Sequence, residues 1–334
     1  MACSARHPLP MTLTLYNPSH DEALAAGTPC YTPTRAATQQ ALAHPWLPLA
    51  WSGQGDVLLC FEQQMSAATA VAYVVGDPSR QPHRGAALGR LMAAVTAVEP
   101  WGWDAHIVAL LSRLGVPRSA MPSPAWLDGV RRLSSRQTAV TALSLLRRRL
   151  PLLTVGESRW CDSAEAVAAA VDDFDGRAVM KTPWSSSGRG VFFLSQPSVA
   201  AHREAIVSKY VSRGGLAVER AYRVAQDFGV EYAYRDGVAH YLGLSLFATR
   251  EGGGYVANRR AAQSEAAAAL RACLAVPAAL DAVLAALPAV LSEVLGSDYC
   301  GPLGVDMLVT ADGALHPCVE INLRRTMGHV ALAE

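Results

Sequence analysis

The chain is 334 residues long, which at roughly 100–200 residues per domain predicts two or three domains. Hydrophobic residues make up 51% of the chain and charged residues 17%, a composition that supports a large core and argues against extended disorder. The formal net charge of +1 gives no overall basic field for nucleic acid. No continuous apolar run reaches the about 18 residues of a membrane helix, so neither nucleic acid nor membrane is an expected partner.

Seven cysteines are scattered along the chain without a CxxC pair, so neither a disulfide framework nor a zinc ribbon is expected. Residues 1–10 contain no apolar segment of the kind found in secretory signals. Both observations favour a reduced, cytoplasmic location.

The first third of the chain alternates strand and helix patterns, which predicts an α/β domain with a parallel sheet. Residues 12–18 read as a strand ending at an Asn-Pro turn, and the apolar run 56–61 is typical of a buried strand. Helices are predicted at 86–98 and 103–115. A Pro-rich boundary follows, so the first domain is expected to span 1–125.

The remaining chain mixes helices with strands that return on themselves. Helices are predicted at 134–151 and 161–174, and a helical stretch at 263–296 is expected to be interrupted by Pro277 and Pro288. Strands are predicted at 177–183, 191–194 and 216–222. Two strands joined at Asp236-Gly237 are predicted over 230–247, and a β-hairpin over 301–322. We expect two subdomains, 126–215 and 216–334.

A lysine followed by a Gly/Ser-rich loop forms the first candidate site. Lys181 and Lys209 are the only lysines among 29 basic residues, so each is a candidate for a role that needs a compact charge. Lys181 ends a strand, and the loop 185–190 with sequence SSSGRG precedes the next one. Glycine backbone and serine hydroxyls can turn donors toward a phosphate. The alternative is an ordinary hairpin with a flexible turn.

A second candidate site lies in the last predicted hairpin. Asp306 is in one strand, and Glu320 and Asn322 share one face of the next. Carboxylate and amide oxygens suit Mg²⁺, and a charge inside an apolar strand is costly unless it is paired or metal-bound. Arg324 follows and could meet a phosphate. The alternative is charges on an edge strand that face water.

The loop of this hairpin decides whether the carboxylates can meet. A two-residue loop at Asp312-Gly313 places Asp306 and Glu320 on opposite faces. A three-residue loop, 311–313, pairs Thr310 with the residue at 314 and places both carboxylates on one face. We predict the three-residue loop, Gly313 with positive φ, and Asp306 opposite Cys318.

Taken together and in this order, the motifs resemble the ATP-grasp superfamily. The order is Lys181, the Gly-rich loop, a hinge with Glu219, Asp306, and EINLR ending at Arg324. The resemblance covers about residues 131–330 and implies an ATP-grasp fold, with a Rossmann-like α/β domain before it. One departure is Arg136, which stands where an Asp-Lys is common in the superfamily.

The resemblance also implies site residues. Mg²⁺ would be held by Asp306, Glu320 and Asn322, while Lys181 and Arg324 would serve catalysis. ATP would be bound by Lys181, Ser185, Ser186, Ser187, Gly188, Arg189, Gly190, Glu219 and the backbone at Ala221, with Asp227 or Glu231 on the ribose.

The activity implied is that of an ADP-forming ligase. A small acid or peptide carboxylate would be activated as an acyl phosphate and then joined to an amine or thiol. A kinase that phosphorylates a hydroxyl, and a nucleotide-binding module without turnover, remain alternatives. A homodimer is one expected assembly.

Two further clusters are substrate candidates. Asn17, His20 and Asp21 follow the first strand, where α/β domains bind ligands, although turn and helix-cap chemistry is the favoured explanation. Asn258, Arg259 and Arg260 follow a Gly-rich loop and could clamp an acidic group. The sequence does not identify the acid or the acceptor.

Overall fold

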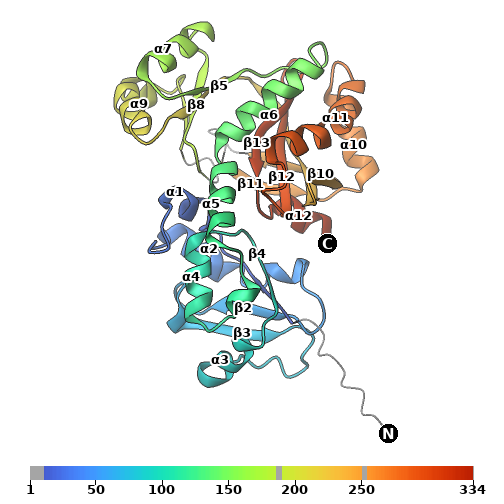
Figure 1. Cartoon of the computed structure of the whole chain (residues 1–334). Coiled ribbons are helices and arrows are strands. Elements are labelled where there is room, and N and C mark those ends of the chain that lie inside the picture. Colours follow the sequence, from blue (N-terminus) through green and yellow to red (C-terminus); the bar gives the residue numbers. More distant parts are fainter. Residues whose placement is uncertain (1–10, 186–189, 250–253, 334) are drawn as a thin grey trace. The chain divides into compact units, whose positions relative to one another are not determined.

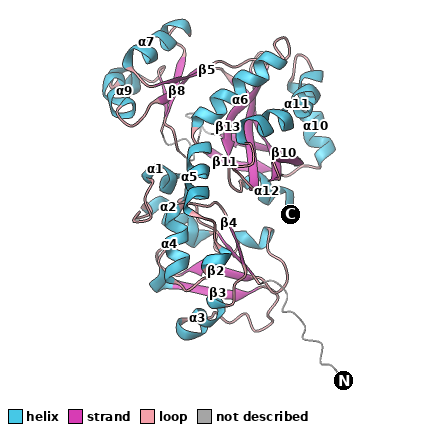
Figure 2. Cartoon of the chain, in the orientation of Figure 1, coloured by secondary structure: helices cyan, strands magenta, loops and turns pink. Residues whose placement is uncertain are grey.

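The computed structural model describes residues 11–185, 190–249 and 254–333 (Figure 1). The chain divides into two compact units, Met1–Asp128 and Gly129–Leu332. Each unit contains its own sheet or sheets with helices packed against them (Figure 2). The predicted mixture of α/β and α+β structure is confirmed.

The first unit contains a four-stranded sheet with the order β3-β2-β1-β4. Its strands are β1 (Thr12–Leu15), β2 (Val57–Phe61), β3 (Ala70–Val74) and β4 (Ala97–Pro100). β1 is parallel to β2 and β4, as predicted, and β3 is an antiparallel edge strand. The helices are α1 (His20–Ala26), α2 (Arg35–Ala43), α3 (Gly85–Ala93) and α4 (Ala105–Arg113), with 3₁₀ turns at Leu47–Ala50, Ala67–Thr69 and Arg118–Ala120.

The helix expected at 86–98 ends early. α3 stops at Ala93, and the next residues turn into β4, which pairs with β1. Val95 and Val98 are buried in the core of this unit. Pairing and burial of β-branched residues therefore outweigh the helical periodicity of the segment.

The second unit begins with helix α5 (Pro124–Leu133), which crosses the boundary, and helix α6 (Arg136–Arg149). A four-stranded antiparallel sheet follows with the order β5-β8-β6-β7, here named the Lys181 sheet. Its strands are β5 (Ser158–Cys161), β6 (Ala178–Lys181), β7 (Val191–Phe193) and β8 (Leu216–Arg220), and its helices are α7 (Ala164–Asp173), α8 (Pro197–Ala201) and α9 (Arg203–Val211). Because β8 pairs with β5 and β6, this sheet continues to Arg220, beyond the subdomain boundary expected at 216.

A five-stranded antiparallel sheet with the order β11-β10-β9-β12-β13 completes the unit and is here named the Asp306 sheet. Its strands are β9 (Val224–Arg235), β10 (Val238–Thr249), β11 (Tyr255–Arg259), β12 (Gly301–Thr310) and β13 (Leu315–Asn322). Helices α6, α10 (Gln263–Cys273) and α11 (Ala278–Leu295) pack against it, and α12 (Met327–Ala333) follows the last strand.

The interruption predicted at Pro277 is confirmed, because α10 ends at Cys273 and α11 begins at Ala278, whereas the interruption predicted at Pro288 is absent from α11. Pro288 lies inside it, because the buried apolar side chains of this helix outweigh the one hydrogen bond that proline removes. Among the described helices, α11 alone passes a length-and-composition test for a membrane-crossing helix. Its Leu280, Val283 and Leu287 are completely buried within the unit.

Candidate functional site

The Lys181 sheet has one apolar face and one face that carries an ion pair. Met180 and Val218 point into a core formed with α7 and α9. Because side chains alternate along a strand, Lys181 and Glu219 point to the other face, where the Lys181 ammonium pairs with the Glu219 carboxylate. Both side chains are about nine-tenths buried. The alternation of side chains along β6 and β8 therefore places the predicted lysine, Lys181, and the predicted hinge carboxylate, Glu219, on the same face of the sheet.

Side chains of the Asp306 sheet alternate between its two faces in the same way, across all five strands. Its buried apolar rows contain Phe228, Val230, Leu244, Leu246, Val305, Met307 and Ile321. The rows between them form what we name the polar face. Each row consists of residues that are paired across neighbouring strands. The first row contains Gly243, Glu231, Gly304 and Asn322, and the second contains Ser245, Gly229, Asp306 and Glu320. The third contains Asn258, Phe247, Asp227, Leu308 and His316. The sheet thus brings together carboxylates from three strands.

The β12–β13 hairpin has the predicted three-residue loop. Thr310 pairs with Ala314, and Gly313 has φ +82°. Further along, the pairing shifts between Asp306 and Leu308, so that Asp306 lies opposite Glu320 rather than opposite Cys318. The expected partner was wrong, but the shift is two residues and preserves the face. Asp306 and Glu320 therefore share the polar face, as the metal hypothesis requires.

Negative charge accumulates at Asp306. Burial first, and then the charges of Glu320 and Glu231, raise the pKa of the Asp306 carboxyl, whereas Arg324 and a hydrogen bond from Asn322 lower it. The Asn322 Nδ2 donates to the Asp306 Oδ2 at 3.1 Å.

The residues present fit a hard cation. A cation here would relieve the repulsion between carboxylates, and two carboxylates with one amide oxygen are a donor set that Mg²⁺ accepts. No group of three or more His, Cys, Asp and Glu side chains with metal-site geometry occurs in the described residues. The set would therefore depend on the Asn322 oxygen and on phosphate or water oxygens to complete coordination.

Arg136 is a functional candidate that sequence reasoning did not assign. It begins α6, is 6% exposed, and its Nη2 lies 3.0 Å from the Glu320 Oε1 and donates to the Ser185 Oγ at 3.0 Å. Its buried Nε has no hydrogen-bond partner among the described residues. The only sequence signal was its position in the lead-in helix, where the superfamily commonly has Asp-Lys. Arg136 connects the Gly-rich loop to the proposed metal site.

Asp227 and His316 belong to one row of the polar face, and the charge of Lys181 acts on the pKa of both. Burial raises the pKa of Asp227, while the Thr249 hydroxyl, which donates to Asp227 at 2.6 Å, and the charge of Lys181 lower it. Burial, opposed by the charge of Glu219 and assisted by that of Lys181, lowers the pKa of His316 to about 4, so this imidazole is neutral at pH 7. Asp227 is partly buried and stays a candidate for a ribose contact, as predicted.

Glu231 does not occupy the position expected of a ribose ligand. Its side chain is 1% exposed and accepts hydrogen bonds from Ser245 and Thr326, each at 2.8 Å. Because both carboxylate oxygens are already engaged inside the protein, Glu231 is not available to ribose hydroxyls. Of the two predicted carboxylates, Asp227 is the better placed.

The Gly-rich loop lies partly outside the described residues, and the predicted roles of Ser186, Ser187, Gly188 and Arg189 fall there. At its ends, Ser185 contacts Arg136, and Gly190 has φ +75° with its carbonyl accepting from the Thr182 backbone. The hinge backbone is held by Ala221, whose N–H donates to the Arg177 carbonyl at 2.8 Å.

The cluster at 258–260 is divided by the sheet. Asn258 lies opposite Phe247 and therefore belongs to the polar face. Arg259 lies opposite Leu246 and points to the other face, and Arg260 follows the end of β11. The expected clamp of Arg259 with Asn258 is wrong, because neighbouring residues of a strand face opposite sides.

The predicted cluster in the first unit forms a buried network. The Asn17 Nδ2 donates to the Gly102 carbonyl at 2.8 Å and to Asp104 at 3.2 Å, and the His20 Nδ1 lies 3.4 Å from Asp104. Asp104 also caps α4. Asn17 and His20 are 1% exposed, so turn and cap chemistry accounts for them; Asp21 is partly buried beside them in α1.

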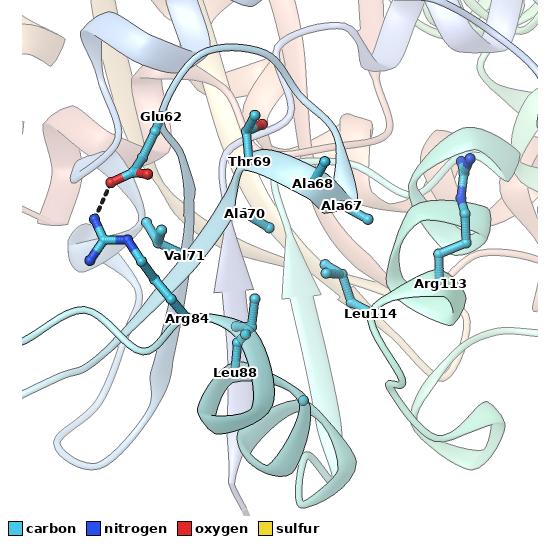
Figure 3. A pocket seen from close by; sticks show the side chains of 12 residues that line it. Glu62, Ala67, Ala68, Thr69, Ala70, Val71, Arg84, Leu88, Arg113 and Leu114 are labelled. Carbon is cyan, nitrogen blue, oxygen red and sulfur yellow. Dashed lines mark hydrogen bonds and ion pairs between the residues drawn. The ribbon is translucent and has the colours of Figure 1, made fainter.

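A separate cavity of about 350 Å³ lies in the first unit (Figure 3). Glu62 and Arg84 pair at one side of it, and Leu88 and Arg113 also line it. None of the residues predicted from the sequence lines this cavity.

These features define the class of fold. An α/β unit is followed by a unit with two antiparallel sheets, of which one carries Lys181 and the other carries Asp306, Glu320 and Asn322. This is the arrangement that the ATP-grasp motifs imply.

No protein-family model and no curated protein matches the sequence. Similar solved structures include N5-carboxyaminoimidazole synthetase from Staphylococcus aureus in complex with ADP, with 12% identity, a TM-score of 0.48, and 95% of this chain and 72% of that chain covered. Biotin carboxylase from Campylobacter jejuni has 14% identity and a TM-score of 0.49, with 72% and 51% covered. A RimK domain ATP-grasp protein from Sphaerobacter thermophilus has 21% identity and a TM-score of 0.38, with 72% and 79% covered. None of these likenesses bears on the substrate of this chain.

Proposed function

We propose that this protein is an ATP-dependent, ADP-forming ligase of the carboxylate–amine or carboxylate–thiol type, located in the cytoplasm. A carboxylate oxygen of a small acid or peptide attacks the γ-phosphorus of ATP, and ADP leaves. The amine or thiol then attacks the acyl carbon of the acyl phosphate and displaces phosphate. Two small-molecule partners are therefore required in addition to ATP.

The observation that carries this proposal is the shared face of Asp306, Glu320 and Asn322, which a cation would stabilise. A bound Mg²⁺ would supply charge neutralisation at the phosphates. Arg324 follows these residues, and its positive charge already lowers the pKa of Asp306. Phosphoryl transfer depends mainly on such positioning and neutralisation, so no protein nucleophile is needed.

Lys181 provides the second cation. In the described structure its ammonium is paired with Glu219 and is close enough to Asp227 and His316 to shift their pKa values. We assign Lys181 to the nucleotide phosphates or the adenine edge. Arg136, paired with Glu320 and Ser185, links the phosphate loop to the metal residues.

A screen for ADP release from ATP tests the proposed activity. Purified protein is supplied with Mg²⁺-ATP and with amino acids, dipeptides and small acids, each with and without an added amine or thiol. ADP release that requires both a carboxylate and an acceptor is the expected result. ADP release with a hydroxyl compound alone would identify a kinase, and nucleotide binding without any turnover would identify a binding module.

Replacing Glu320 by Gln tests the metal assignment. The substitution removes one charge from the proposed Mg²⁺ site at nearly constant volume, so turnover should fall on the order of 100-fold and excess Mg²⁺ should restore it only partly. Mn²⁺ binding in the presence of a non-hydrolysable ATP analogue should weaken in parallel. Wild-type dependence on Mg²⁺ in Glu320→Gln would place the metal elsewhere.

A further inference from the structure

A buried hydrogen-bond network surrounds Glu231 at one end of the polar face. Its Oε1 accepts from the Ser245 hydroxyl of β10 at 2.8 Å. Its Oε2 accepts from the Thr326 hydroxyl at 2.8 Å and lies 3.0 Å from the His329 Nδ1. A buried carboxylate is costly unless its oxygens are engaged, and here partners from two separate parts of the chain engage both.

Three glycines leave the space that this carboxylate fills. A Cβ added to Gly304 would lie 2.6 Å from the Glu231 Oε2, and one added to Gly229 would lie 2.7 Å from its Oε1. A Cβ on Gly328 would collide with the same oxygen. These glycines come from β12, β9 and α12, so three elements converge on a single side chain.

Thr326 connects this network to the end of the chain that carries Arg324. Its hydroxyl donates to Glu231 and accepts from the backbone N–H groups of Gly328 at 3.1 Å and His329 at 3.3 Å. It therefore stabilises the first turn of α12 and anchors that turn to β9. Arg324 lies two residues before Thr326 and two residues after the proposed metal residue Asn322.

We propose that Glu231 and Thr326 are positioning residues that hold the segment 323–326, and with it Arg324, beside Asp306 and Glu320. This inference rests on the proposed function for the role given to Arg324. Neither Glu231 nor Thr326 touches substrate in this assignment, since they are 1% and 8% exposed. They act through the chain segment that the Thr326 hydroxyl anchors.

Ser245 offers a matched control. Its hydroxyl donates to the other oxygen of Glu231 with the same length, but it belongs to β10 and, among the described residues, makes no hydrogen bond to α12. If the network around Glu231 only fills the interior, removing the Thr326 hydroxyl and removing the Ser245 hydroxyl should change turnover to a similar extent. A positioning role predicts that the Thr326 hydroxyl matters for turnover and that the Ser245 hydroxyl does not.

The first measurement needs no substrate. Amide hydrogen exchange of peptides spanning 322–332 is compared in wild type, Thr326→Val, Thr326→Ser and Ser245→Ala. We expect Thr326→Val to lose protection in this segment while the Lys181 sheet keeps its protection, and Thr326→Ser to restore it. Unchanged protection in Thr326→Val would overturn the inference, whatever reaction the protein catalyses.

The second measurement uses ADP release with the acid and acceptor found in the screen. We expect Thr326→Val and Glu231→Gln to lower kcat by about tenfold or more with little change in KM for ATP, because a misplaced catalytic group loses orientation. Thr326→Ser and Ser245→Ala should remain near wild type. Equal losses in Ser245→Ala and Thr326→Val, or no loss in Thr326→Val, would overturn the positioning role.

The two proposals can fail separately. A wild-type protein that releases no ADP with any acid and acceptor contradicts the ligase, and the exchange experiment then decides the anchoring alone. If Thr326→Val does not fold, Glu231→Gln keeps the volume of the buried side chain and is measured in its place.

Discussion

The Lys181–Glu219 pair combines a proposed catalytic role with a structural one. Lys181→Ala should lower ATP turnover on the order of 100-fold, because a cation in a shielded site cannot be replaced by water. It should also destabilise the second unit by about 3–5 kcal/mol, because Glu219 would remain buried without its partner. Stability is measured by urea unfolding and turnover by ADP release.

The double variant Lys181→Met with Glu219→Gln separates these effects. It should recover much of the stability without recovering turnover. Lys209→Arg is the matched control and should be close to neutral, because Lys209 is exposed and lies 5.2 Å from the Tyr210 ring. A folded Lys181→Ala protein with normal turnover would remove Lys181 from the site.

His316 should make the second unit sensitive to mild acid. Its pKa is about 4 in the folded protein and 6.5 when unperturbed, so the unfolded chain binds the proton more tightly. Stability is therefore complete above about pH 6.5 and is lost as the pH falls toward 4, by about 2 kcal/mol at pH 5 relative to pH 7. Urea unfolding at both pH values should show this loss in wild type and a smaller loss in His316→Gln. An identical pH dependence in the two proteins would contradict the assignment.

Among the secondary-structure elements, the β12–β13 hairpin changes register along its length, yet its carboxylates stay on the same face of the sheet. Leu308 pairs with His316 next to the turn, whereas Asp306 pairs with Glu320, so β13 contains two extra residues between these pairs. An odd shift would have turned Glu320 and Asn322 away from Asp306, because side chains alternate with a period of two. Pro317 lies inside the irregular stretch of β13, which is an edge strand, the kind of position where proline is tolerated in a sheet.

The turn of this hairpin requires glycine at residue 313. Gly313 has φ +82°, and a Cβ there would lie 2.8 Å from the Ala275 backbone nitrogen. Gly313→Ala should destabilise the unit by about 1–3 kcal/mol. Gly129→Ala in α5 is the control, since nothing lies within 4 Å of the added Cβ, and it should gain about 0.5–1 kcal/mol. Both are measured by urea unfolding, and a neutral Gly313→Ala would contradict the turn.

At the scale of the whole molecule, each unit has a core of its own. Leu13, Val57 and Ile107 belong to a core cluster confined to the first unit, whereas Phe174 and Val218 belong to one in the second. Calorimetry should therefore resolve two unfolding transitions.

A non-hydrolysable ATP analogue with Mg²⁺ should raise the midpoint of the transition that belongs to residues 129–332. A ligand at a free concentration 100 times its dissociation constant stabilises the folded state that binds it by about 2.7 kcal/mol. The shift should be smaller in Glu320→Gln. A shift confined to the first unit would contradict the assigned nucleotide site.

The local features of this protein and the order of its motifs follow from the amino-acid sequence without the structure. The alternation of apolar and polar residues predicts strand β6, which ends at Lys181. Residues suited to turns predict the turn at Asp236-Gly237 and the three-residue loop before β13. Both signals depend on residues that are close together in the chain. Because these features are local, the ATP-grasp resemblance and the same-face position of Asp306 and Glu320 were accessible before the structure.

Only the tertiary structure decided which side chains meet across the strands. It placed Glu231 in a buried network with Thr326, turned Arg259 to the face opposite Asn258, and brought Arg136 to Glu320. Each result depends on the register and packing of elements that are far apart in the chain, and a change of one residue in register reverses the face of a side chain. Local patterns contain no information about such a pairing, so these contacts became visible only when the strands were assembled into a sheet.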